Sequence, residues 1–180
     1  MGRLLQAIIL GLIGAAAVHI AVLLMLPGYS ERDAWSRLKE MTDMYETVRI
    51  DSRSGGEAAI KSLDPLFDAV ACRFDLRDGV TRVSAAAHPE FWSISIYDRM
   101  GQNVFSFNDR AAPDGVVDFV VATPTQMIEL RNELPAEFDK SVFVETDINE
   151  GIAVVRSFVP DETWEPTVSR YLREIDCVPH

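Results

Sequence analysis

The residues best suited to binding or chemistry are concentrated between Trp92 and Arg110. The segment begins with Trp-Ser-Ile-Ser-Ile-Tyr-Asp-Arg and ends with Phe-Asn-Asp-Arg. Tryptophan, tyrosine and arginine are enriched at the energetic centres of protein interfaces, and arginine and asparagine offer several hydrogen-bonding groups to a ligand. Trp92, Tyr97, Arg99, Asn108 and Arg110 are therefore the candidate rim of a ligand or partner site.

A structural interpretation of the same segment competes with this one. The triplets at 97–99 (Tyr-Asp-Arg) and 108–110 (Asn-Asp-Arg) follow two successive expected strands. We expect their aspartates and arginines to pair across the hairpin, because a forked arginine–carboxylate contact fixes geometry as well as charge. On this interpretation the segment clamps a turn and binds nothing.

The sequence carries no recognisable catalytic, cofactor or metal signature. The aspartates of the 92–110 segment lack a nucleophile, a base and an orienting group in order. There is no Gly-x-Ser-x-Gly elbow, no phosphate-binding glycine loop and no Cys-x-x-Cys pair, and the chain has three histidines. We therefore predict no catalytic, cofactor-binding or metal-ligating residues and regard an enzyme as the less favoured class.

The hydrophobic period from residue 64 onward predicts a mainly-β domain around this segment. Alternation with a period of two predicts strands over 66–76, 80–86, 91–97, 103–107, 116–122, 141–146 and 152–158. Arg77-Asp78-Gly79 is a hairpin signal between the first two strands, and helices are expected over 124–134 and 162–176. These elements predict an antiparallel sandwich or jelly-roll-like fold with peripheral helices.

The N-terminal region predicts one transmembrane helix. Leu4 to Leu26 contains no charged residue, and a helix of this length rises about 33 Å, enough for a hydrocarbon core of about 30 Å. A signal peptide cleaved near residues 14–17 is the alternative, but cleavage there would leave an exposed apolar N-terminus. We expect an uncleaved signal anchor, and Arg3 on its short side favours a cytoplasmic N-terminus with the domain exported.

An amphipathic helix is expected between the anchor and the β-domain. Pro27-Gly28 is expected to end the anchor, and Ser30 with Asp33 has the spacing of a capping box. Apolar residues then recur at helical spacing over about 31–50. These residues are Trp35, Leu38, Met41, Met44 or Tyr45, and Val48. The stripe packs either on the protein's own domain or on a partner or the membrane surface.

A flexible joint is expected at Ser52–Gly56. The predicted organisation is therefore a transmembrane signal anchor over 1–28, a juxtamembrane helix and joint over 29–56, and an exported β-rich domain over 57–180.

One face of the anchor is built of small residues. Ala7, Gly11 and Ala15 recur every four residues, and Gly14 lies beside them. Small side chains let a second membrane helix approach closely, although they are also common in spans that pack on nothing. We expect the anchor to contact lipid and, through this face, a membrane-protein partner or a larger complex.

Cys72 and Cys177 are candidates for a disulfide. An even number of cysteines in an oxidising compartment invites pairing. Two separate buried thiols that behave as small hydrophobic side chains are the alternative. Both interpretations stay open at the level of the sequence.

The charge of the chain excludes some partners. The net charge is −11, with the carboxylates scattered along the sequence. Such a surface repels nucleic acid and anionic lipid headgroups. We therefore expect no nucleic-acid partner.

The 92–110 segment also resembles a bacterial family catalogued as domain of unknown function 1254. Supporting matches are Asp64-Pro65, the run Cys-Arg-Phe-Asp-Leu over 72–76, and Asp78-Gly79 after it. The resemblance covers about residues 59–158 and implies a β-rich envelope domain of unassigned activity. Together with the predicted anchor, by which this sequence departs from the family, it gives an expected location in the bacterial inner membrane with the domain in the periplasm. Longer members carry a second uncharacterised domain, number 1214. Its absence here implies that another polypeptide supplies it.

These observations predict a non-enzymatic, single-pass envelope protein whose exported domain binds a protein partner, most simply a chain that carries domain 1214. The first alternative is a small-molecule-binding or enzymatic domain that uses the Trp92–Arg110 hairpin as a pocket wall. The second is an accessory subunit of a larger membrane complex, held through its transmembrane helix. A closed pocket lined by the rim residues would favour the ligand, and a flat apolar patch there would favour the partner.

Overall fold

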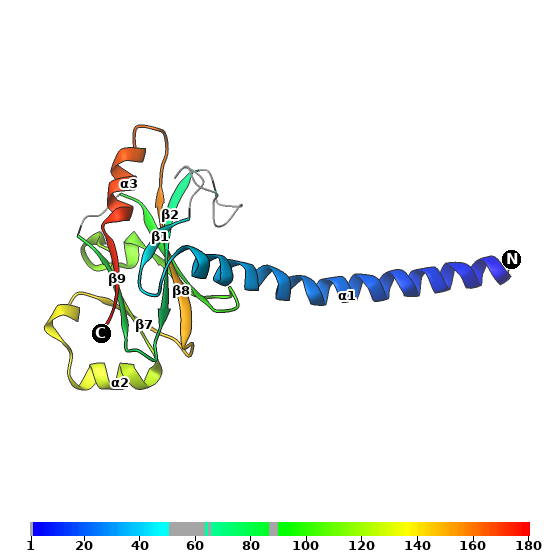
Figure 1. Ribbon diagram of the computed structural model, residues 1–180, viewed down its shortest axis with the longest axis horizontal. Helices are drawn as coiled ribbons and strands as arrows, with labels where there is room; N and C mark the ends of the chain where they lie inside the picture. Colours follow the sequence, from blue (N-terminus) through cyan, green and yellow to red (C-terminus); the bar gives the residue numbers. More distant parts are fainter. Residues whose placement is uncertain (1, 51–63, 65, 87–89) are drawn as a thin grey trace.

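A long N-terminal helix and a two-layered β-domain make up the computed structural model (Figure 1). The structure describes residues 2–50, 64, 66–86 and 90–180, without the side chains of residues 26–33. The joint expected at Ser52–Gly56 lies outside the described residues.

Helix α1 runs without interruption from Gly2 to Met41. Its segment Gly2–Met25 has a mean hydropathy of 2.6 and is not buried by the rest of the protein, so by length and composition it can cross a membrane. The expected break at Pro27-Gly28 and the expected new helix start at Ser30 are wrong, because α1 passes through both. A proline removes one backbone hydrogen bond and can kink a helix without ending it.

The amphipathic helix expected over 31–50 ends at Met41. Tyr45 then adopts a left-handed backbone conformation, with φ of 64°, and the chain enters strand β1 (Thr47–Arg49). Trp35 and Leu38 are buried, whereas Met41 is 44 % exposed. Helical spacing was therefore a valid guide only for the first two members of the predicted stripe.

The β-domain is a sandwich, as predicted. Sheet A has five strands in the order β1-β2-β8-β4-β5, all antiparallel. The strands added here are β2 (Phe67–Asp75), β4 (Trp92–Asp98), β5 (Asn103–Asn108) and β8 (Glu150–Phe158). Sheet B has four strands in the order β7-β6-β3-β9, of which β6 and β7 are parallel. They are β3 (Thr81–Ala85), β6 (Asp118–Ala122), β7 (Val142–Glu145) and β9 (Ile175–Pro179).

The hairpin expected at Arg77-Asp78-Gly79 is wrong, because β2 belongs to sheet A and β3 to sheet B. The turn carries the chain from one layer to the other. Gly79 has φ of 138°, and a Cβ at this position would overlap the backbone oxygen of His180. Directly after it, Val80 and His180 exchange two backbone hydrogen bonds of 2.9 and 2.8 Å. Glycine is required here for its backbone conformation and for the close approach of the chain after β9.

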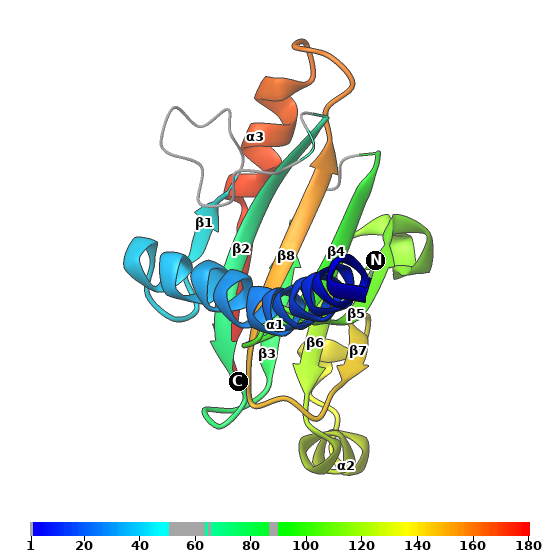
Figure 2. The same ribbon diagram turned by 90° about the vertical axis from the view of Figure 1, so that its right-hand side faces the viewer.

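The main core lies between the two sheets. Trp92, Ile94 and Ile96 of β4 point into it, as the alternating sequence predicts, and Phe119 and Val121 of β6 face them. The opposite face of sheet A is covered by the C-terminal part of α1, which crosses the sheet in Figure 2.

Two further helices lie at opposite ends of the strands (Figures 1 and 2). They are α2 (Pro124–Asn132) and α3 (Glu165–Arg173). Both lie where the sequence predicts helices, but the second gives way to β9 at Ile175. Three short 3-10 turns complete the described elements: η1 (Asp109–Ala111), η2 (Pro113–Gly115) and η3 (Ala136–Phe138).

Candidate functional site

The residues predicted to form one rim lie at two opposite ends of the β4–β5 hairpin. The strands are antiparallel, with Ser93 opposite Asn108 and Tyr97 opposite Asn103. The triplet 97–99 is therefore at the turn end and the triplet 108–110 at the far end. The predicted clamp between the two triplets is wrong, because the last residues of consecutive antiparallel strands point to opposite ends of a sheet.

The members at the far end have structural contacts. The Trp92 side chain is 2 % exposed, and its Nε1 donates a hydrogen bond of 2.8 Å to the Gly115 carbonyl. The Asn108 side chain caps η1 by accepting from the backbone N–H of Arg110 at 3.2 Å. These contacts stabilise the segment after β5.

Tyr97 and Arg99, at the turn end, belong to the surface of the β-domain on which the C-terminal part of helix α1 packs. We call this surface the seat of α1. The guanidinium carbons of Arg73 and Arg99 lie 5.4 and 5.7 Å from the centre of the Trp35 ring, within the range of a cation–π interaction. Arg99 is held by Glu150 on β8, with Nη1 to Oε2 at 2.8 Å. Tyr97 packs against the apolar cluster that contains Trp35.

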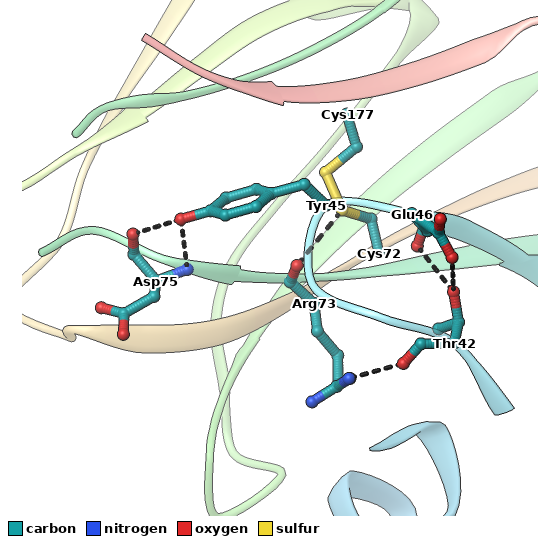
Figure 3. Close-up of a disulfide and its surroundings, with 7 residues drawn as sticks. All are labelled: Thr42, Tyr45, Glu46, Cys72, Arg73, Asp75 and Cys177. Carbon is teal, nitrogen blue, oxygen red and sulfur yellow. Dashed lines mark hydrogen bonds between the residues drawn. A yellow bond between two sulfur atoms is a disulfide. The ribbon is translucent and has the colours of Figure 1, made fainter. Parts of the chain in front are cut away.

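Burial makes Arg73 an unusual part of this seat. It is 5 % exposed, and its Nη2 donates to the carbonyl of Thr42, just beyond α1 (Figure 3). Burial lowers the pKa of the guanidinium from its ordinary value. The apolar part of the seat lies beside it and consists of Ile50, Ala69, Ala71, Ile152 and Val154, against which Leu38 of α1 packs. Of the two interpretations of the amphipathic stripe, packing on the protein's own domain is confirmed for Trp35 and Leu38.

A disulfide joins Cys72 to Cys177 (Figure 3). It links β2 of sheet A to β9 of sheet B across 105 residues of sequence, with the two Cα atoms 6.5 Å apart. Tyr45 packs on the same core, and its hydroxyl donates to the Asp75 carbonyl at 2.7 Å. Burial and a hydrogen bond to Asp78 raise the pKa of Tyr45 to about 12, so it stays neutral at physiological pH.

A concave surface that was not predicted lies beside α2. A hollow of about 710 Å³ extends between this helix, the Gly79 turn and η3. A second hollow, of about 370 Å³, lies on the other side of the helix and is lined by Met127, Arg131, Phe143 and Glu145. Leu130 and Leu134 line both hollows. Neither hollow contains any of the predicted rim residues.

Local sequence explains where α2 begins and how it is attached to the domain. Thr123 and Gln126 form a capping box at its N-terminus, with Pro124 in the first turn. The Gln126 side-chain amide donates a 2.7 Å hydrogen bond to the Leu76 carbonyl, which ties the helix to the end of β2. Met127 and Phe138 are buried against the outer face of sheet B. The helix is thus held at its start, and Leu130 near its C-terminus and Leu134 just after it line the hollows.

The rim of the larger hollow is acidic. Glu129, Glu133 and Glu137 line it. Glu137 lies 3.8 Å from Arg82 and 3.6 Å from His180. Within the described residues, the side chains of Glu129 and Glu133 have no cationic partner. The floor contains Val80 and Phe138, so the hollow combines an apolar base with uncompensated negative charge.

The described residues contain no group of three or more histidine, cysteine, aspartate or glutamate side chains placed to hold a metal ion. The small residues of the anchor, Ala7, Gly11, Gly14 and Ala15, lie exposed on α1. A Cβ at Gly11 or Gly14 would meet nothing within 4 Å. Their role in packing stays a prediction.

Comparison with protein families gives one match. The model of the family described as "Protein of unknown function (DUF1254)" matches residues 69–179. No curated protein matches the chain.

Two solved structures are similar to this fold. One is the VPA0106 protein from Vibrio parahaemolyticus, with a TM-score of 0.60 and 14 % identity over 84 % of this chain and 35 % of that one. The other is a putative uncharacterized protein from Burkholderia cenocepacia, with a TM-score of 0.44 and 16 % identity over 73 % of this chain and 37 % of that one. The chain thus spans about a third of the length of either protein, and the first likeness establishes a shared fold.

Proposed function

The chain belongs to the DUF1254 family, and we propose that it is a non-enzymatic, single-pass protein of the bacterial inner membrane whose periplasmic domain binds a protein partner. The observation that carries the proposal is the pair of hollows beside α2, where Leu134 is 47 % exposed and where Glu129 and Glu133 have no cationic partner among the described residues. Exposed apolar side chains with a polar rim are typical of surfaces that bind other proteins.

The remaining features support the membrane and compartment parts of the proposal. Gly2–Met25 has the length and hydropathy of a secretion signal or an anchor. The Cys72–Cys177 disulfide is consistent with a location outside the cytoplasm, where such bonds persist. The simplest partner is a chain that carries domain 1214, the companion of this domain in the longer family members.

Protease protection tests the topology. In intact spheroplasts, added protease should remove the β-domain and leave a short anchored fragment, because the domain faces the protease. A domain that is digested only after the membrane is permeabilised would show the opposite orientation.

Partner binding is tested by crosslinking the full chain in its own membranes, purifying it in mild detergent and identifying what co-elutes by mass spectrometry. The matched control is residues 1–28 fused to an unrelated soluble domain. Proteins enriched only with the full chain support binding by the β-domain. Equal enrichment by both proteins would support the accessory-subunit alternative, in which the anchor makes the main contact, and no enrichment would contradict partner binding.

A further inference from the structure

The hollows on the two sides of α2 form one binding surface, which we name the α2 groove. It is defined by Val80, Leu130, Leu134 and Phe138 as its apolar part, by Glu129, Glu133 and Glu137 as its rim, and by Met127 and Phe143 in the smaller hollow. Leu130 and Leu134 belong to both hollows, so side chains placed on either side of the helix would contact the same two leucines.

We propose that the α2 groove docks a protein segment in which apolar side chains are flanked by lysine or arginine. This inference rests on the proposed function and names the site and the chemistry of the partner. The apolar part of the groove would bury leucine-sized side chains, and the rim would pair with their basic neighbours.

Charge complementarity is the argument for a basic segment. Glu129 lies in the last turn of α2 and Glu133 is the residue that caps its C-terminus, and both line the larger hollow. Neither has a cationic partner within the described residues, whereas Glu145 in the second hollow lies 3.7 Å from Arg131. The net charge of the whole chain is −11, which also favours a basic partner segment and disfavours an acidic one.

The dimensions favour a peptide segment over a compact small molecule. The nine residues of α2 extend over about 13 Å, and the hollows follow both of its sides. Volumes of about 710 and 370 Å³ each accommodate a few side chains. Short segments that lay alternate side chains into neighbouring hollows bind in this way.

Matched variants separate binding at the groove from attraction by the general acidic surface. Leu134→Ser removes an exposed apolar group inside the groove. Ile128→Ser removes one of similar size outside it, since Ile128 is 61 % exposed and lines neither hollow. The double variant Glu129→Gln/Glu133→Gln neutralises the two rim carboxylates that have no cationic partner among the described residues, and Glu162→Gln neutralises an exposed carboxylate before α3.

The probe is a fluorescent ten-residue peptide of alternating leucine and lysine, titrated by anisotropy onto the full chain in phosphatidylcholine nanodiscs, with empty nanodiscs subtracted. The affinity should fall about tenfold for Leu134→Ser, because burial of one leucine-sized side chain contributes about 1.5 kcal/mol or more. It should fall several-fold for the rim variant at low salt and stay unchanged for Ile128→Ser and Glu162→Gln. Circular dichroism should show the same fold in all variants.

Equal affinity of the leucine–lysine peptide for all variants would overturn the proposal that it docks in the groove, because the attraction would then come from the acidic surface as a whole. Binding of a leucine–glutamate peptide as tight as that of the leucine–lysine peptide, or no binding of either, would also overturn it. Crosslinking with Leu134→Ser distinguishes this failure from that of the proposed function. A partner captured equally by wild type and Leu134→Ser rejects the groove alone, whereas no partner with wild type rejects the function.

Discussion

The Arg99 guanidinium lies 5.7 Å from the centre of the Trp35 ring, so the turn after β4 contacts the helix that carries the apolar span. Trp35 is 9 % exposed, and Leu38 and Ile152 belong to the same apolar cluster. The contact between the helix and the domain is therefore a packed interface, and its loss should be measurable.

Trp35→Ala should lower the free energy of unfolding of the domain by about 3 kcal/mol, because it empties a buried aromatic site and removes two cation–π contacts. Urea unfolding of the full chain in detergent, followed by circular dichroism, measures this loss. Met41→Ala, on an exposed residue of the same helix, should change it by less than about 0.5 kcal/mol. Similar losses of unfolding free energy for both variants would contradict the packing of Trp35 against the domain.

Removal of the disulfide should cost about 4 kcal/mol. Cys72→Ala/Cys177→Ala opens a loop of 105 residues, and the chain-entropy estimate for a loop of this size is of that order. The same urea titration checks the loss. Alkylation before reduction should leave both cysteines of wild-type protein unlabelled, and free thiols in freshly isolated membranes would contradict the bond.

Gly79→Ala should destabilise the domain by about 2 kcal/mol or more, because its positive φ is strained for alanine and its Cβ would overlap the His180 backbone. Gly115→Ala is the control. Gly115 also has a positive φ, of 68°, but a Cβ there would meet nothing within 4 Å. Thermal unfolding should therefore show a clearly larger loss for Gly79→Ala, and equal losses would show that the close approach to His180 has no effect.

The Asp75–Arg77 pair should give the domain a stability that depends on acid pH. Hydrogen bonds from Arg77, with Nε to Oδ1 at 2.9 Å, hold the pKa of Asp75 below its ordinary value. The unfolded chain therefore takes up a proton at higher pH than the folded one. The stabilisation is present above about pH 4 and is lost as the pH falls through the folded-state pKa.

Asp75→Asn should therefore destabilise the protein at pH 7, and the difference from wild type should shrink below about pH 4. Urea titrations at a series of pH values measure it. Arg77→Gln removes the cause of the pKa shift and should show the same pH dependence as Asp75→Asn. A difference that stays constant down to pH 2 would contradict the assignment.

The positions of most strands could be predicted because β4, β6 and β8 alternate or run apolar over five residues or more. Two strands were missed for local reasons. β1 has three residues and continues from a helical pattern, and β9 follows α3 with only Ile175 and Cys177 buried. Segments this short carry too little periodicity to be distinguished from a helix end.

The sheet to which each strand belongs was harder to predict from the sequence than the position of the strand. Arg77-Asp78-Gly79 has the composition of a hairpin turn. The glycine, however, is needed because the backbone of His180, about a hundred residues later, packs closely against it. Nothing local distinguishes a turn within one sheet from a turn between two. The disulfide was left open by the sequence for the same reason, because its formation depends on β2 and β9 facing each other.

The structure does not bring the rim residues predicted from composition together on one surface. Trp92 and Arg99 are residue types that favour interfaces, yet one is in the core and the other is beside α1. The α2 groove is formed by Leu130, Leu134 and Glu133, which look like an ordinary amphipathic helix end. The spacing of two leucines and two glutamates by four residues was the available signal, and only the position of the Gly79 turn opposite them makes a hollow.

The uninterrupted course of α1 limits the distance between the domain and the apolar span. Ten residues separate Met25, at the end of the apolar span, from Trp35 in its seat, a rise of about 15 Å along the helix. With Gly2–Met25 retained as an anchor, as proposed, the domain would be confined to a thin layer next to the lipid headgroups. A partner anchored in the same bilayer would meet it at a far higher effective concentration than a freely diffusing one, so a weak contact at the groove would suffice for lasting association.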